Sequence, residues 1–79
     1  MDKKNCERIK IFLEDSFKDK QVGLKIDIIQ KNPQYQMRIK VNKNQSHLLR
    51  HIYDAAFFMC ALNGEYLANM RKRGNFLYL

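Results

Sequence analysis

The apolar positions near the start of the chain recur with the spacing of an α-helix. They fall every three or four residues, at Cys6, Ile9, Leu13 and Phe17. Asp2 stands just before this pattern, where its carboxylate can accept a hydrogen bond from a backbone N–H of the first turn. Most of the other positions are charged. The sequence therefore predicts a helix over residues 3 to 19 with one buried stripe and one solvated face.

The period of the pattern then changes from 3.6 to 2. Apolar and polar residues alternate over residues 22 to 30 and again over residues 35 to 42, as they do in strands with one face in a core. The connection Lys31-Asn32-Pro33-Gln34 contains Asn-Pro, a turn signal. We therefore expect an antiparallel hairpin.

A second helical pattern extends over residues 47 to 73, with Asn44 or Ser46 placed to cap its start. Gly64 lies inside this range, either as the end of the helix or as a tolerated break. The run Arg71-Lys72-Arg73 before Gly74 has the composition of a helix C-terminus. The sequence predicts a second helix that ends near Arg73.

Residues 75 to 79 form a short apolar tail, which we expect to dock as an edge strand or to fill a groove. An isolated hairpin is only marginally stable, so both helices should pack on its apolar face. The predicted fold is a single α+β domain over residues 1 to 79: helix, strand, strand, helix, and a C-terminal edge strand.

The second predicted helix carries apolar side chains on nearly every side, including Leu49, Ala56, Phe57 and Phe58. One hairpin and one other helix cannot cover such a surface, so we expect a homodimer or a higher oligomer. The residues expected at this interface are Leu49, Tyr53, Phe57, Phe58, Phe76 and Leu77.

Composition fits one small globular domain, because 46% of the 79 residues are hydrophobic and 29% are charged. The longest apolar run, residues 55 to 62, is far shorter than the roughly 20 residues that span a bilayer. The start of the chain does not have the pattern of a secretory signal. We expect a cytoplasmic protein with no membrane partner, in which Cys6 and Cys60 are buried, reduced thiols.

The formal net charge of +7 favours a polyanionic partner. More than half of it lies in residues 21 to 45, which contain five basic residues and one acidic residue. Such lysines can also simply keep a sheet face soluble. Cations of the hairpin and of the second helix are the candidate phosphate contacts: Lys25, Lys31, Arg38, Lys40, Lys43, Arg50, Arg71, Lys72 and Arg73.

Candidate chemistry elsewhere is sparse. His47 and His51 stand four residues apart on one helix face, but no third metal ligand accompanies them, and the three glycines are too scattered to cradle phosphate. We therefore expect no metal, no cofactor and no enzymatic activity. A metal-independent ribonuclease, using side chains such as His47, His51, Tyr53 or Arg50, stays open as a third hypothesis.

These observations favour a small nucleic-acid-binding protein, RNA more than DNA, that acts as an oligomer through contacts to backbone phosphates. Tyr35 and Tyr78 are the candidates for stacking on bases. An alternative is a protein-interaction inhibitor, such as an antitoxin-like or phage counter-defence factor that blocks a host enzyme. The size and the lysine and asparagine content also suit that class of phage or mobile-element protein.

Overall fold

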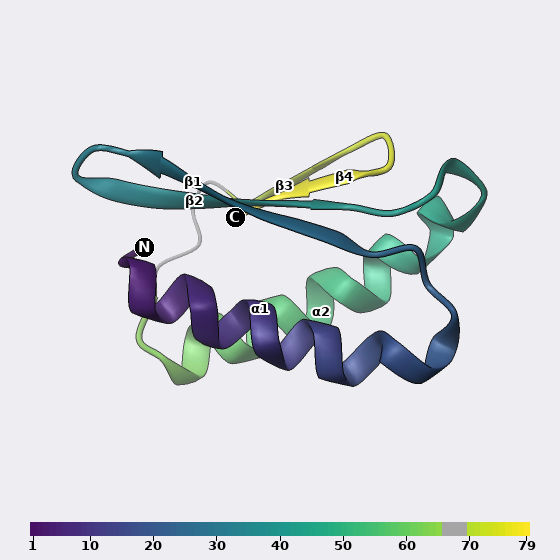
Figure 1. Ribbon diagram of the computed structural model, residues 1–79, viewed down its shortest axis with the longest axis horizontal. Helices are drawn as coiled ribbons and strands as arrows, with labels where there is room; N and C mark the ends of the chain where they lie inside the picture. Colours follow the sequence, from purple (N-terminus) through teal and green to yellow (C-terminus); the bar gives the residue numbers. More distant parts are fainter. Residues whose placement is uncertain (66–69) are drawn as a thin grey trace.

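Two helices pack against one face of a four-stranded antiparallel sheet in the computed structural model of the chain (Figure 1). The structure describes residues 1 to 65 and 70 to 79. The predicted α+β architecture is confirmed, and the sheet has two more strands than the predicted hairpin. Its opposite face is left uncovered by the two helices (Figure 1).

The order of the strands in the sheet differs from their order along the chain. The elements are α1 (Lys3–Phe17), η1 (Lys18–Lys20), β1 (Lys25–Lys31), β2 (Gln34–Lys40), η2 (Lys43–Leu48), α2 (Leu49–Leu62), β3 (Arg71–Arg73) and β4 (Phe76–Tyr78). The strand order is β1-β2-β4-β3. The β3–β4 hairpin therefore comes back to place its second strand against β2.

Helix α1 forms as the periodicity predicts. The backbone N–H of Asn5 donates to Oδ1 of Asp2 at 2.7 Å, so the predicted cap is confirmed. All four positions of the predicted stripe are buried. The last residues of the predicted range form the 3₁₀ turn η1, which Gln21 ends with a left-handed backbone (φ 52°).

The predicted hairpin is present with shifted boundaries. Strands β1 and β2 pair in antiparallel register from Lys25↔Lys40 to Lys31↔Gln34, across the two-residue turn Asn32-Pro33, whose peptide bond is cis. The alternation before Lys25 is real, since Val22 and Leu24 pack against the core. The side chain of Gln45 forms hydrogen bonds with the backbone of this segment: it accepts from the N–H of Gly23 and donates to the carbonyl of Gln21. The pairing of β1 with β2 therefore begins at Lys25, later than predicted.

The second predicted helix is wrong at both ends. Helix α2 begins at Leu49 after the 3₁₀ segment η2, and neither Asn44 nor Ser46 caps it through a side chain. It ends at Leu62 because Gly64 takes a left-handed backbone, with φ 72°.

Two backbone hydrogen bonds seal this end of α2. The N–H of Gly64 donates to the carbonyl of Ala61 at 3.2 Å, and that of Glu65 donates to Cys60 at 2.9 Å. This is the Schellman arrangement, which stops a helix. Of the residues predicted to continue the helix, Tyr66 and Leu67 lie outside the described part of the chain.

Residues 71 to 79 form a hairpin where a helix end and an edge strand were predicted. Arg71–Arg73 is the strand β3, and Gly74 opens the turn to β4 with φ 62°. Glycine at the first central position with positive φ is typical of tight hairpin turns. The apolar tail is thus an inner strand, between β2 and β3, and β3 is the edge.

Hydrogen bonds extend the pairing of β2 with β4 past both ends of the short strand. Met37 and Leu79 exchange backbone hydrogen bonds of 3.0 and 3.3 Å. The carbonyl of Val41 accepts from the side-chain amide of Asn75 at 2.6 Å, and its N–H donates to the Asn75 carbonyl at 3.1 Å. These bonds hold β4 in the middle of the sheet.

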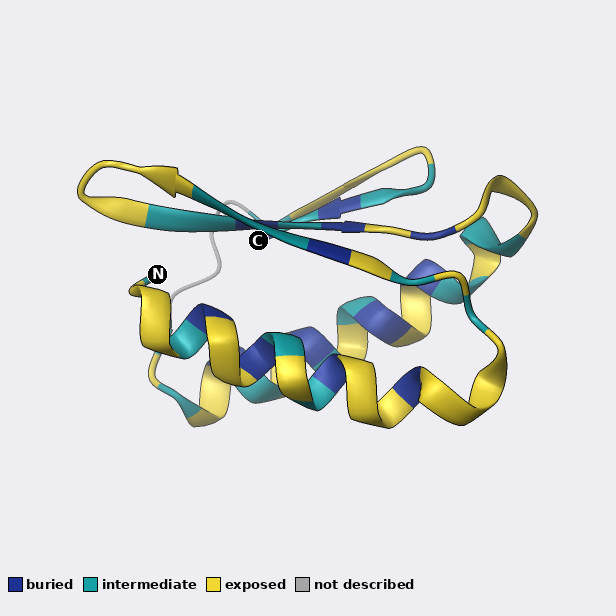
Figure 2. Cartoon of the chain, in the orientation of Figure 1, coloured by how far each residue is buried: buried dark blue, intermediate teal, exposed yellow. Residues whose placement is uncertain are grey.

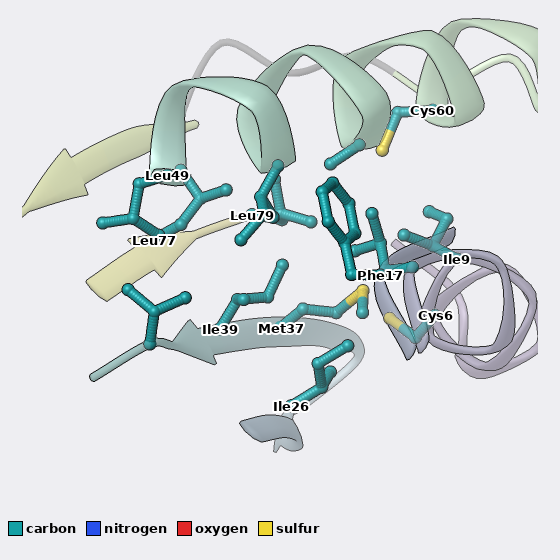
Figure 3. Close-up of a cluster of buried hydrophobic side chains, with 14 residues drawn as sticks. Cys6, Ile9, Phe17, Ile26, Met37, Ile39, Leu49, Cys60, Leu77 and Leu79 are labelled. Carbon is teal, nitrogen blue, oxygen red and sulfur yellow. The ribbon is translucent and has the colours of Figure 1, made fainter. Parts of the chain in front are cut away.

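The core lies between the sheet and the helices (Figures 2 and 3). It is formed by Cys6, Ile9, Leu13, Phe17, Ile26, Met37, Ile39, Val41, Leu49, Ile52, Ala56, Cys60, Leu77 and Leu79. All are apolar side chains or thiols, and among the described residues no polar or charged side chain is buried with them. The hydrophobic effect is therefore the main force that holds the two layers together.

Both thiols are free and fully buried, as predicted. Burial away from water disfavours the thiolate and raises the pKa of Cys60 from the ordinary 9.0 to about 11, with smaller contributions from the charges of Glu65 and Cys6. Burial likewise raises the pKa of Cys6.

In residues 1 to 65 and 70 to 79, no helix has the length and apolarity needed to cross a membrane.

Candidate nucleic-acid interface

The uncovered face of the sheet carries a compact set of cations and aromatic rings. Side chains of β1 to β4 that alternate with the buried Ile26, Met37, Ile39 and Leu77 point to this side, because neighbours along a strand face opposite ways. We define the outer face by these residues: Lys25, Asp27, Arg38, Lys40, Arg71, Arg73, Phe76 and Tyr78.

The pairing register arranges the outer face in two rows across the four strands. Residues paired across strands lie on the same face and in contact distance. One row runs Lys25, Lys40, Phe76, Arg73, and the other runs Asp27, Arg38, Tyr78, Arg71. Each row therefore has an aromatic ring on β4 with a cation on both sides of it.

One acidic side chain, Asp27, stands among the five cations of the outer face. Nη2 of Arg38 bonds Oδ2 of Asp27 at 3.0 Å, and both side chains keep more than a third of their surface exposed. An ion pair exposed to this extent adds little stability. Its main effect is to orient Arg38 along the face and to offset part of its charge.

The two rings of β4 lie beside each other and beneath cations. The centroids of Phe76 and Tyr78 are 6.1 Å apart, and the ring planes are nearly parallel, at 19°. Nζ of Lys40 lies 5.7 Å from the centre of Phe76, and Cζ of Arg71 lies 5.7 Å from the centre of Tyr78. Both distances are within the range of cation–π attraction.

Five of the nine predicted phosphate contacts come together on the outer face: Lys25, Arg38, Lys40, Arg71 and Arg73. Lys31 shares their side of the sheet but lies at the hairpin turn, six residues along β1 from Lys25. The other three predicted contacts lie elsewhere.

Those three residues are separated from the outer face by the fold. Lys43 is in η2, and Arg50 is on α2, where its Nε lies 3.8 Å from Asp54. Lys72 pairs with the buried Leu77 and so points to the helix side of the sheet. The side chains of Arg71-Lys72-Arg73 are therefore divided between the two faces of the sheet, because this run is the strand β3 and not the predicted helix end.

The predicted oligomer interface is also divided. Leu49 and Leu77 have no exposed surface and belong to the core of the single chain, so they cannot contact a partner. Phe76 lies on the outer face. The rings of Tyr53 and Phe57 stack on each other along α2, with centroids 6.5 Å apart.

The exposed apolar surface of the helix layer is centred on α2. Phe58 and Leu62, four residues apart, are 59% and 66% exposed, and Phe57 is 51% exposed. At about 100° per residue, Phe58 is on the opposite side of the helix from the buried Ala56 and Cys60. We call Phe58 and Leu62 the helix patch.

The candidate histidines are on the helix layer and not on the outer face. His47 and His51 are exposed, on η2 and α2. His51 and Lys20 border a hollow of about 440 Å³ whose other walls are Phe17, Val22 and Leu48. Throughout the described residues, no three His, Cys, Asp or Glu side chains gather as metal ligands would.

Sequence reasoning assigned the aromatic residues of the site incompletely. It placed Phe76 at an oligomer interface, and it proposed Tyr35 for stacking although Tyr35 packs against the core. A usable signal was present in Gly74-Asn75, a dipeptide typical of two-residue hairpin turns, which would pair Arg73 with Phe76 and Arg71 with Tyr78. Applied there, it puts Phe76 and Tyr78 on the same side as Arg71 and Arg73.

No family model, no curated protein and no solved structure matches the chain. Its function therefore has to be inferred from the chemistry of the residues that the fold brings together.

Proposed function

We propose that the protein is a small, non-enzymatic nucleic-acid-binding protein that binds RNA through the outer face of its sheet. The observation that carries this proposal is the convergence of Lys25, Arg38, Lys40, Arg71 and Arg73, from the strands β1, β2 and β3, on one side of the sheet. Lysine and arginine are the usual partners of phosphate oxygens, and contacts of this kind set affinity and position on a nucleic acid.

The charge distribution supports a polyanion as the ligand. The outer face concentrates five of the fifteen basic side chains of the chain, with one carboxylate, and the chain as a whole has a formal charge of +7. Clustered charge of one sign raises the local concentration of oppositely charged ligands. The neutral aromatic rings between the cations offer stacking surfaces, which favours RNA because its recognition usually involves unpaired bases.

Self-association through the helix layer is part of the proposal. The helix patch exposes two large apolar side chains next to each other, and a second copy of the chain would remove them from water. Contact through the helices would leave both outer faces free and directed away from each other. An RNA long enough to pass from one outer face to the other would contact both, which raises its apparent affinity.

Light scattering during size-exclusion chromatography tests both parts of this proposal. We expect freshly purified protein to elute as a nuclease-sensitive complex heavier than a dimer, with strong absorbance at 260 nm. After RNase treatment in high salt it should become a dimer. A particle free of nucleic acid that contains one other protein would contradict the proposal and favour the alternative, an inhibitor of an enzyme.

The dimer surface is tested separately with Phe58→Glu. We expect this variant to be a folded monomer, because the side chain is exposed in the single chain and the charge opposes only the contact with a second copy. Ile11→Glu is the matched control, because Ile11 is 60% exposed but lies on α1, outside the helix patch. This variant should remain a dimer. A wild-type protein that is already monomeric after RNase treatment would rule out self-association.

A further inference from the structure

The two rings on β4 are placed where a nucleic acid on the cations would meet them. Phe76 and Tyr78 occupy the middle of the two rows of the outer face, with Lys40 and Arg38 on β2 to one side and Arg73 and Arg71 on β3 to the other. A strand held by its phosphates on these cations therefore passes over both rings.

The distance between the two rings favours single-stranded over double-stranded nucleic acid. Their centroids are 6.1 Å apart, nearly twice the ~3.4 Å that separates successive nucleotides along one strand of double-stranded DNA. In a duplex, moreover, each base is already stacked on its neighbours and offers only its edges. Two rings at this distance can stack on two bases only when the strand is unpaired and stretched.

The orientation of the rings favours two bases of one strand. The planes of Phe76 and Tyr78 differ by only 19°, so successive bases can approach them in similar orientations. Every base has a π face, and such stacking therefore tolerates sequence variation.

We infer that the outer face binds single-stranded RNA by stacking two neighbouring bases on Phe76 and Tyr78 while the surrounding cations hold the flanking phosphates. This inference rests on the proposed function and adds the form of the RNA. It assigns to Phe76 a role in binding, in place of the role in oligomer formation that its apolar character had indicated.

The cationic groups of Lys40 and Arg71 occupy one position in the free protein and another in the complex with RNA. In the free protein their cationic groups lie over the rings of Phe76 and Tyr78, where cation–π attraction offsets the exposure of the aromatic surface. Both side chains are exposed and long enough to swing aside. When a base covers each ring, the cation moves to a phosphate of the same strand.

Competition between RNA forms provides the first test. The probes are a labelled oligouridine of about 12 nucleotides, which is within the site sizes of single-strand binders, and a blunt RNA duplex with the same number of phosphates. We expect the wild type to bind the oligouridine at least about tenfold more tightly. The Phe76→Ile, Tyr78→Ile double variant should lose that preference, because isoleucine suits a strand but cannot stack on a base.

A single tryptophan provides the second test, since the chain contains none. Tyr78→Trp places the reporter on the outer face, and its fluorescence should be quenched when oligouridine stacks on it. Tyr53→Trp is the matched control in the helix layer, where Tyr53 stacks on Phe57. Its fluorescence should stay unchanged during the same titration.

The outcomes separate this inference from the proposed function. Equal binding of both RNA forms, unchanged in the Phe76→Ile, Tyr78→Ile variant, would overturn the stacking inference and leave phosphate binding in place. Absence of binding to either RNA would overturn both. Loss of the single-strand preference alone, with circular dichroism showing an intact fold and duplex binding retained, supports the inference.

Discussion

The alternation of Arg71, Lys72 and Arg73 across the two faces of β3 gives a sharp prediction about salt. Replacing Arg71 and Arg73 by Gln removes two cations from the outer face and keeps side chains of similar length. Replacing Lys72 by Gln removes one cation from the helix side of the same strand. Only the first change should reduce the number of phosphates that the protein neutralises.

The size of the effect follows from the number of cations. If all five cations of the outer face contact phosphates, the logarithm of the affinity for single-stranded RNA falls with the logarithm of salt concentration with a slope of about 3.5, at ~0.7 per contact. Without Arg71 and Arg73 the slope should be about 2.1. Between ~50 and ~200 mM salt, the wild type should lose affinity roughly 100-fold and the double variant roughly 20-fold.

Fluorescence anisotropy of a labelled oligouridine, measured at several salt concentrations, gives these slopes directly. We expect the Lys72→Gln slope to equal that of the wild type. A Lys72→Gln slope shallower than that of the wild type by ~0.7, the amount expected for the loss of one phosphate contact, would refute the placement of these side chains on opposite faces. It would favour a diffuse charge effect in which position on the sheet is irrelevant.

Three further changes test other parts of the structure. Asp27→Asn should strengthen RNA binding several-fold in a filter-binding assay, because it removes the carboxylate that pairs with Arg38; weaker binding would show that the pair positions Arg38 for RNA. Gly64→Ala should lower the free energy of unfolding by about 1 kcal/mol in urea denaturation, from backbone strain alone since a Cβ would meet no atom within 4 Å. Gly64→Asn should cost less, and equal costs would argue against the left-handed helix end. The free energy of unfolding of the wild type should exceed that of Cys60→Ala by a difference that is fully present below pH 9 and is lost as the pH rises toward about 11. The reason is that the pKa of Cys60 is higher in the folded state than in the unfolded state, so the folded state keeps the thiol proton to higher pH. Denaturation of both proteins at pH 8 and above pH 10 measures that difference, and a constant difference would contradict burial of the thiol.

The first half of the fold could be predicted because its patterns are long. Fifteen residues of α1 and seven residues in each of β1 and β2 repeat their period often enough to identify both the element and its buried side. Even the hydrogen-bonded cap at Asp2 follows from local chemistry. The boundaries at Val22 and Leu24 were wrong because alternation shows which side chains face the core but not which backbone groups pair.

The last part of the chain could not be predicted from its pattern. Strands β3 and β4 have three residues each, too few to establish a period, and cations before a glycine are equally compatible with a helix end and with a hairpin. Because of this error, the sequence interpretation listed Arg71 and Arg73 with Arg38 and Lys40 as phosphate contacts but did not place them in the same sheet. The cations were identified from composition, but their meeting around Phe76 and Tyr78 depends on long-range pairing of β4 with β2.

Nuclear magnetic resonance of the isotope-labelled protein tests the central claim most directly. We predict that titration with oligouridine shifts the backbone amide signals of β2, β3 and β4 and the ring signals of Phe76 and Tyr78, while α1 and the exposed side of α2 change little. Shifts confined to the helices, or no shifts at low salt, would contradict binding of RNA at the outer face.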